Sequence, residues 1–304
     1  MEFGIIGLGR MGGNLARQAL AKGCRVVGYD PDIRVREELA GLGLEPAASL
    51  AELAAHLRPP RTALIYVPHG EPTDGVCRQL LTVFQPGDIV ADGGNSHWED
   101  SRRRYNLFAQ RGIKFLDVGT SGGIPGARSG ACFMVGGDQE AFADIRPVLR
   151  ALAADDEAVF YAGPPGAGHF VKLVHNAIEF GMVQAIAEGV ELLLASDYRL
   201  DLPGLFNNWV HGSVIRSWLV DLMGRALAQN SDLSPLSTYV EDTGEVKWVL
   251  AWALERDIPV PVTGTAQTAL MQYRDVDSPA AKAVALLRNQ YGGHPVHRRA
   301  GASG

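Results

Sequence analysis

Apolar and polar residues follow two different periods along the first half of the chain. Short apolar runs bounded by Gly, Pro or Asp recur, and runs of this kind predict buried strands. These predicted strands cover residues 3–6, 25–29, 63–67, 89–92, 115–118, 132–135 and 158–161. Between them, apolar residues repeat every three or four positions, which predicts helices over residues 11–22, 33–42, 75–84, 98–110 and 140–153. The alternation predicts a mostly parallel sheet with helices on both faces.

The pattern changes after the Gly- and Pro-rich stretch at residues 163–168. Beyond it only helical spacing remains, over residues 170–195, 202–210, 214–228, 243–255, 264–273 and 280–290. The sequence therefore predicts an α/β fold, with a doubly wound sheet domain over residues 1–165 and an all-helical domain over residues 166–294. Residues 295–304 are expected to form a flexible tail.

Composition and charge exclude several classes of protein. With 304 residues, 46% of them hydrophobic, the chain is long enough for two domains with cores of their own, which argues against a disordered protein. The net charge of −6 argues against nucleic-acid binding, and the arginine run at 102–104 is interpreted as a solvated helix face. Cys24, Cys77 and Cys132 are too widely spaced for a disulfide framework or a zinc site, so we expect no metal. No apolar run approaches the roughly 20 residues of a membrane span and no export signal is visible, so we expect a cytoplasmic protein.

A glycine-rich turn follows the first predicted strand. It fits the pattern G-x-G-x-x-G, with Gly7-Leu8-Gly9-Arg10-Met11-Gly12. Gly7 permits the tight turn, Gly9 lets the backbone approach a pyrophosphate, and Gly12 lets the next helix pack closely on the strand. The N–H groups at the start of that helix would bind the anion. The turn therefore predicts a dinucleotide-binding Rossmann domain.

Asp30 stands at the end of the second predicted strand, 18 residues past Gly12. Its carboxylate is placed to bind the ribose hydroxyls of the cofactor and would repel the 2′-phosphate of NADP. NAD is therefore the preferred cofactor, and Arg34 leaves NADP as a second candidate. The structural alternative is that Asp30 only caps the following helix.

A polar stripe lies on the first predicted helix of the second half. Lys172, His175, Asn176 and Glu179 fall within about a third of the helix circumference. Few other charged residues occur between residues 170 and 194, which predicts a helix that crosses a domain interior. Lys172 and Glu179 are seven residues apart, about 10 Å along the axis, so a small anionic substrate could lie between them. The alternative is an ordinary solvated stripe.

Three segments together resemble the decarboxylating 6-phosphogluconate dehydrogenases. They are residues 92–96, residues 119–130 and the motif Lys172-x-x-His175-Asn176-x-x-Glu179. The resemblance continues through residues 214–217 and 288–294, and the length is similar to that of the short forms, which lack the duplicated helical half. The broader β-hydroxyacid dehydrogenase family shares the lysine but usually has Asn where His175 stands and lacks the Glu179 acid.

This resemblance implies oxidative decarboxylation of 6-phosphogluconate to ribulose 5-phosphate and CO₂, with reduction of NAD. It implies that Lys172 takes the 3-hydroxyl proton and later returns a proton to the carbonyl oxygen. Glu179 then protonates C1 of the enediol. A lysine base must be neutral, and burial lowers the pKa of an ammonium from about 10.4 toward neutrality. The same apolar surroundings favour the protonated form of Glu179.

The resemblance also assigns the remaining ligands. The substrate carboxylate and hydroxyls would contact Asn95, Ser121, Gly122, Gly123, His175 and Asn176. The phosphate would contact Arg216, Arg288 and His294, through paired bonds from the arginine forks. The cofactor would contact Gly7, Leu8, Gly9, Arg10, Met11, Gly12, Asp30, Val67 and Asn95. In the family the tail completes the site of a neighbouring subunit, so Arg288 and His294 imply a homodimer or homotetramer.

Some positions depart from the family pattern. Phe180 stands where the family usually has Tyr, which removes a hydroxyl that helps to hold the phosphate. Lys247 lies in a segment that differs from the phosphate loop of the long forms and is one further candidate phosphate ligand. His69 lies near the expected cofactor cleft and is interpreted as structural or solvent-facing. Two other functions stay open: a dehydrogenase or reductase of another 3-hydroxy acid, such as an unphosphorylated sugar acid, and a non-catalytic NAD-binding sensor.

Overall fold

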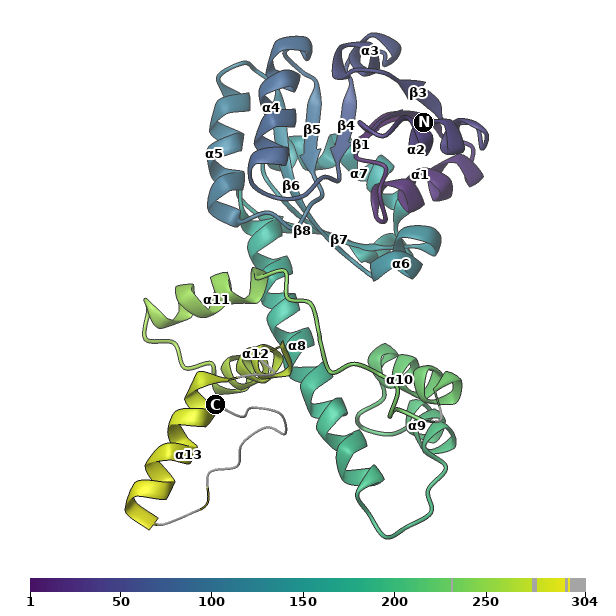
Figure 1. Ribbon diagram of the computed structural model, residues 1–304. Coiled ribbons are helices and arrows are strands. Elements are labelled where there is room, and N and C mark those ends of the chain that lie inside the picture. Colours follow the sequence, from purple (N-terminus) through teal and green to yellow (C-terminus); the bar gives the residue numbers. More distant parts are fainter. Residues whose placement is uncertain (231, 275–277, 293–294, 296–304) are drawn as a thin grey trace. The chain divides into compact units, whose positions relative to one another are not determined.

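The computed structural model describes residues 1–230, 232–274, 278–292 and 295. The chain divides into two compact units, and their labelled elements are drawn in Figure 1. Unit 1 comprises Met1–Ala177, and unit 2 comprises Ile178–Gly304.

Unit 1 is built on one eight-stranded sheet with the order β3-β2-β1-β4-β5-β6-β7-β8. Its strands are β1 (Glu2–Ile6), β2 (Arg25–Tyr29), β3 (Glu45–Ala47), β4 (Thr62–Ile65), β5 (Ile89–Asp92), β6 (Lys114–Ser121), β7 (Cys132–Gly136) and β8 (Val159–Gly163). All neighbouring strands are parallel except β6 and β7. The order from β3 to β6 is that of a Rossmann fold, so the predicted α/β class is confirmed.

Helices cover both faces of this sheet. They are α1 (Gly12–Ala21), α2 (Ile33–Ala40), α3 (Leu50–His56), α4 (Glu71–Val83), α5 (Trp98–Ala109), α6 (Gly123–Ser129) and α7 (Gln139–Leu152), with a 3-10 turn at Asp156–Ala158. Consecutive strand residues belong to different cores: Ile5 packs with α1 and α7, whereas Ile6 packs with α3, α4 and α5. Strand β1 is therefore buried on both sides, which explains its apolar sequence.

Three elements were not predicted from the sequence. β3 contains Pro46, which an edge strand tolerates because one side of its backbone needs no partner. α3 is short, and the Ser49 hydroxyl caps it by accepting from the Glu52 N–H. α6 lies in a segment rich in Gly and Pro that resembles a turn, and it begins after Gly122, whose φ is +113°.

Unit 2 is helical throughout its described elements, as predicted. Helix α8 (Ala167–Leu194) begins in unit 1 and is followed by α9 (Leu202–Val210), α10 (Trp218–Gln229), α11 (Glu245–Leu254), α12 (Pro261–Arg274) and α13 (Pro279–Gly292). One buried apolar cluster of unit 2 lies around Val190, Phe206 and Val220. Among the helices described, none is both long and apolar enough to cross a membrane.

A buried carboxylate attaches the start of α8 to the sheet. Asp117 of β6 is inaccessible to solvent, and it accepts hydrogen bonds from the N–H groups of Gly166 (2.7 Å) and His169 (2.8 Å). Such bonds satisfy the first N–H groups of a helix and complement its dipole. Because the first turns of α8 pack on β6, the compact unit continues to Ala177, whereas the sequence placed the domain boundary at residue 165.

Close contact between α8 and β6 requires a glycine at position 119. A Cβ there would lie 2.5 Å from the Lys172 Cβ and 2.8 Å from the Gly168 carbonyl oxygen. Neither distance is compatible with van der Waals packing, and neither neighbour can move without displacing α8. The lysine is therefore held against the strand by the absence of a side chain.

We expect Gly119→Ala to lower the free energy of unfolding by about 1–3 kcal/mol, because it overpacks this contact. The measurement is the urea midpoint, followed by circular dichroism. Gly75→Ala in α4 is the matched control, since an added Cβ there would meet only the Arg78 Nη2 at 3.8 Å. A midpoint for Gly119→Ala equal to that of the control would contradict the assigned contact.

Candidate active site

The glycine-rich turn between β1 and α1 is shaped by two close contacts. Gly7 has a φ of +88°, and a Cβ there would lie 2.4 Å from the Tyr66 carbonyl oxygen. A Cβ on Gly12 would lie 2.0 Å from the Gly7 carbonyl oxygen. Around Gly9, by contrast, an added Cβ would meet no described atom within 4 Å. The turn therefore has one open side, where a pyrophosphate can approach the backbone and the start of α1.

Asp30 is fixed beside this turn. One of its carboxylate oxygens accepts from the Leu8 N–H (2.8 Å) and the other from the Asp32 N–H (2.9 Å). The cap of α2 is Asp32, which accepts from the Arg34 N–H, so capping does not explain Asp30. The Arg34 guanidinium forms an ion pair with Asp32 at 2.7 Å, and this hydrogen bond holds the pKa of Asp32 below its usual value.

The loop after β5 carries Asn95 at the surface, on a buried base. Asp92 accepts from the Ser96 hydroxyl (2.8 Å), the Gly94 N–H (3.1 Å) and the Arg104 guanidinium (3.0 Å). The Arg104 side chain is only 1% exposed. The prediction of a solvated arginine run is therefore wrong for Arg104, because it lies on the inner face of α5, and right for the two arginines before it.

Four of the predicted substrate and catalytic residues form one cluster at the end of β6. The Ser121 hydroxyl lies 3.0 Å from His175 Nε2. The Lys172 Nζ donates to Asn176 Oδ1 at 2.7 Å and lies 3.4 Å from His175 Nδ1. Lys172 is 7% exposed, and Asn176 is also buried. The predicted stripe of α8 is thus partly buried and connected to the sheet rather than fully solvated.

The backbone after Ser121 and after β4 lies at the same end of the sheet, where the parallel strands have their carboxyl ends. Gly122 and Gly123 follow Ser121 with φ values of +113° and +58°, and they open α6. Val67 follows β4, and its carbonyl oxygen would lie 3.0 Å from a Cβ on Gly94. The carboxyl ends of the parallel strands β1, β2, β4, β5 and β6 lie at this edge, which is where open α/β sheets bind their ligands.

This arrangement suits a proton transfer at Lys172. The ammonium is removed from solvent, and removal from solvent lowers the pKa of a lysine. Its hydrogen bond to the Asn176 amide oxygen, and the His175 imidazole nearby, orient the Nζ. Among the described residues, no group of His, Cys, Asp or Glu side chains could hold a metal ion.

The sequence did not single out Tyr66 or His169, which support the cluster. The Tyr66 hydroxyl lies 3.1 Å from the Thr120 Oγ1, and burial raises the pKa of Tyr66 above its usual value. The His169 Nδ1 lies 2.7 Å from the Ser101 hydroxyl of α5. Both contacts join segments that are distant in sequence, so no local pattern indicated them. For His169, the one signal was the helical spacing that places Ser101 on the inner face of α5.

The other predicted residues belong to unit 2. Glu179 and Phe180 are half-buried on α8. Arg216 lies in the exposed turn before α10, where its guanidinium donates to the Ser213 carbonyl oxygen at 3.1 Å. The assignment of Glu179 and Arg216 to the substrate stays a prediction. The side chain of Arg288 in α13, and all of His294, lie outside the described residues.

Lys247 forms an ion pair with Asp242 at 2.6 Å. Asp242 also accepts from the Gln267 amide and the Gly244 N–H. Burial raises the pKa of Asp242, but the Lys247 ammonium and these hydrogen bonds outweigh it and hold the pKa below its usual value. Lys247 is thus already paired with a carboxylate, and its role as a phosphate ligand is not tested. His69 is exposed.

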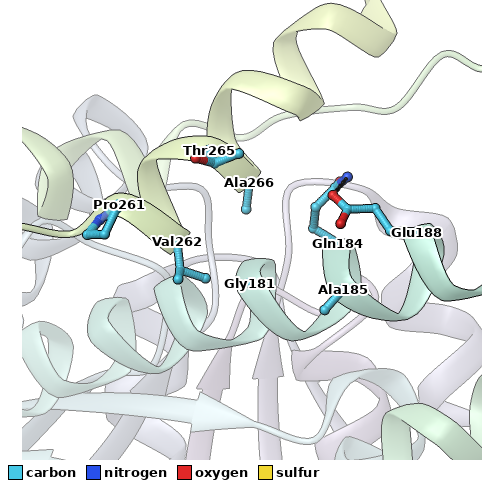
Figure 2. Close-up of a pocket in the computed structure, with 8 residues that line it drawn as sticks. All are labelled: Gly181, Gln184, Ala185, Glu188, Pro261, Val262, Thr265 and Ala266. Carbon is cyan, nitrogen blue, oxygen red and sulfur yellow. Dashed lines mark hydrogen bonds between the residues drawn. The ribbon is translucent and has the colours of Figure 1, made fainter.

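A groove of about 290 Å³ lies within unit 2, between α8 and α12 (Figure 2). It is lined by Gly181, Gln184, Ala185, Glu188, Pro261, Val262, Thr265 and Ala266. The Gln184 amide donates to Glu188 (2.8 Å) and to the Tyr273 hydroxyl (3.0 Å), so these polar groups bind one another. None of the predicted site residues lines the groove, so it is not the candidate active site.

Two family models match the chain. The model described as the NAD binding domain of 6-phosphogluconate dehydrogenase matches residues 2–163. The model described as the C-terminal domain of 6-phosphogluconate dehydrogenase matches residues 168–196. The first of them covers more than half of the chain and includes the glycine-rich turn, Asp30, Asn95 and Ser121.

Individual proteins agree with these matches. A Bacillus subtilis protein described as a putative 6-phosphogluconate dehydrogenase is 42% identical over 301 residues, which are 98% of this chain and 100% of that protein. The NAD(+)-dependent, decarboxylating 6-phosphogluconate dehydrogenase of Haloferax volcanii is 37% identical over 98% of this chain and 99% of its own.

The solved 6-phosphogluconate dehydrogenase of Plasmodium falciparum superposes with a TM-score of 0.83 at 27% identity, over 100% of this chain and 67% of that one. A 3-hydroxyisobutyrate dehydrogenase of Mycobacterium tuberculosis, 23% identical, shares the fold over 91% of this chain and 94% of its own, with a TM-score of 0.72. The chain belongs to the 6-phosphogluconate dehydrogenase family.

Proposed function

We propose that the protein oxidises and decarboxylates 6-phosphogluconate to ribulose 5-phosphate and CO₂ while it reduces NAD. The observation that supports this most is the buried Lys172, which is hydrogen-bonded to Asn176 and lies close to His175 next to Ser121. Glu179 follows on the same helix. A relative that is 37% identical over nearly its whole length carries this activity in its name.

The chemistry needs one base and one acid. Lys172 in its neutral form takes the proton from the 3-hydroxyl, and bound NAD supplies the acceptor for the hydride that leaves C3. The product is a β-keto acid, which loses CO₂ once Lys172 returns the proton toward the carbonyl oxygen. Glu179 then protonates C1 of the enediol. Ser121 and His175 hold the carboxylate and hydroxyls, so that the reacting atoms stay aligned.

The residues of unit 1 fit a dinucleotide. Gly9 leaves the backbone open, and the start of α1 offers N–H groups to a pyrophosphate. The carboxylate of Asp30 is held by two backbone N–H groups in the position where ribose hydroxyls bind. The same charge repels a 2′-phosphate, and Arg34 is paired with Asp32. These contacts favour NAD over NADP.

A second chain is proposed to cover unit 2. The second half of α8 was predicted to lie in a domain interior, yet in the single chain its apolar side chains are exposed. The large apolar side chains exposed in unit 2 include Ile178, Met182, Val183, Leu192, Leu194, Trp218, Leu254, Val262, Met271, Val284, Leu286 and Leu287. Exposed apolar surface of this extent is typical of an obligate interface. We infer a homodimer, or a homotetramer built from it, in which Arg288 and His294 reach the neighbouring site.

A second candidate substrate follows from Phe180. Without a hydroxyl at this position the phosphate loses one ligand, which favours an unphosphorylated 3-hydroxy acid. This alternative retains Lys172 and the cofactor site. A non-catalytic sensor has less support, because sensing does not require a buried lysine in contact with Asn176 and His175.

Turnover of 6-phosphogluconate with NAD is expected to exceed that of gluconate and of 3-hydroxyisobutyrate in kcat/KM, measured by NADH absorbance.

Lys172→Met should lower kcat by about a hundredfold or more, because general base catalysis contributes that much. Glu179→Gln should slow the protonation of the enediol that follows CO₂ loss rather than hydride transfer, so the primary deuterium isotope effect on kcat at C3 should fall toward one. A wild-type preference for gluconate would select the second candidate, and full activity of Lys172→Met would contradict the base assignment.

Asp30→Asn should lower the ratio of kcat/KM for NAD to that for NADP by about tenfold to a hundredfold, because a hydrogen bond to a charged group contributes about 1.5–3 kcal/mol. The amide oxygen can still accept from the Leu8 N–H, so the turn keeps its shape. Glu37→Ala, on the exposed side of α2, is the control. An unchanged ratio in Asp30→Asn would argue against the ribose contact.

Light scattering after size exclusion should give at least twice the 32.6 kDa mass of one chain at micromolar concentration. Leu192→Glu should shift the population toward the monomer, because it introduces a charge into the proposed apolar interface. Leu42→Glu changes an exposed leucine of unit 1 and should leave the mass unchanged. A monomeric wild-type protein would rule out the second chain.

A further inference from the structure

Arg104 is a buried cation that the proposed chemistry does not use. Its side chain is 1% exposed, on the inner face of α5 with Trp98, Ser101 and Phe108. A guanidinium at this depth is unfavourable unless carboxylates and hydrogen-bond acceptors compensate its charge. The contacts that provide this compensation show what the residue holds in place.

Arg104 joins three segments of unit 1. Its Nε donates to Asp74 of α4 at 2.8 Å, and its Nη1 donates to Asp92 at the end of β5 at 3.0 Å. The same Nη1 donates to the Ser96 hydroxyl at 3.1 Å. Burial raises the pKa of Asp74, but the hydrogen bonds from Arg104 and Arg103 outweigh it and hold the pKa below its usual value.

These contacts fix the loop on both sides of Asn95. The Asp92 carboxylate receives the Gly94 N–H and the Ser96 hydroxyl in addition to Arg104. Asp92 and Ser96 are both buried, at 0% and 1% exposure, whereas Asn95 between them is exposed at the sheet edge. The backbone that carries Asn95 is therefore attached before and after it to one buried charge cluster.

We propose that Arg104 is a positioning residue: through Asp92 and Ser96 it holds the loop that presents Asn95 to substrate and cofactor. This inference rests on the proposed role of Asn95. Arg104 does not itself touch substrate. A lysine at position 104 keeps the charge but has a single donor group, so it cannot bridge Asp74, Asp92 and Ser96 in the same geometry.

A double-mutant cycle between Arg104→Lys and Asn95→Ala tests this coupling in the full-length protein. We expect each single variant to lower kcat/KM between about tenfold and a hundredfold, because a misplaced ligand of the reacting substrate has effects of this size. The double variant should be no more than about twofold worse than Asn95→Ala alone, since Arg104 acts through that residue. A purely structural role would instead multiply the two losses, and that result would overturn the proposal.

Arg103→Lys is the matched control, because Arg103 pairs with the same Asp74 but is exposed and makes no hydrogen bond to Asp92 or Ser96. Its kcat/KM should stay within about twofold of the wild type. If Arg104→Lys does not fold, Ser96→Ala takes its place in the cycle, since it removes one link and leaves every charge paired.

The four proteins of the cycle are the wild type, Arg104→Lys, Asn95→Ala and the double variant. Their dissociation constants for NAD are also compared, measured by tryptophan fluorescence. Non-additive effects on NAD binding support the proposal even if 6-phosphogluconate is not turned over, and additive effects on both readouts overturn it. Absence of turnover by the wild type would instead count against the proposed function. The two failures are thus distinguishable.

Discussion

The position of the candidate base depends on one buried carboxylate. Asp117 accepts the N–H groups of Gly166 and His169, and these two bonds hold the N-terminus of α8 on β6. A charged acceptor at a helix N-terminus satisfies donors that would otherwise be buried without partners. Because Gly119 lacks a side chain, Lys172 then lies directly against the strand, within reach of Asn176 and His175. The proposed base is therefore positioned by hydrogen bonds at Gly166 and His169, which lie six and three residues before Lys172 in the chain.

A second buried charge has a comparable effect on the loop after the neighbouring strand β5. The Arg104 guanidinium and the Asp92 carboxylate hold the loop with Asn95, and Ser101 of the same helix contacts His169 at the start of α8. Helix α5 thus connects to both the loop after β5 and the base helix. Buried polar networks of this kind are stabilising only when their members are paired. They also fix geometry, which explains why charged side chains occur here in an otherwise apolar core.

The sequence predicted what local patterns encode. The glycine turn and Asp30 have fixed spacing from a strand and a helix, so their roles follow from sequence alone. β3 was missed because Pro46 interrupts its pattern, and α6 because Gly and Pro in it resemble a turn. Arg104 was misplaced because its partners are distant in sequence, although it follows the helical spacing of Trp98 and Phe108. The fold was therefore accessible from the sequence, and the residues predicted for the cofactor lie together as expected, whereas the supporting contacts required the tertiary structure.

The central claim is that one site in this chain couples oxidation to decarboxylation. A hydroxyacid dehydrogenase with the same fold and the same lysine would form NADH and release a keto acid that keeps its carboxylate. The most direct test is the molar ratio of CO₂ released to NADH formed, with 6-phosphogluconate labelled at C1 and the wild-type protein. Coupled oxidation and decarboxylation should give a ratio of one throughout the reaction. NADH formation without stoichiometric CO₂ would contradict it.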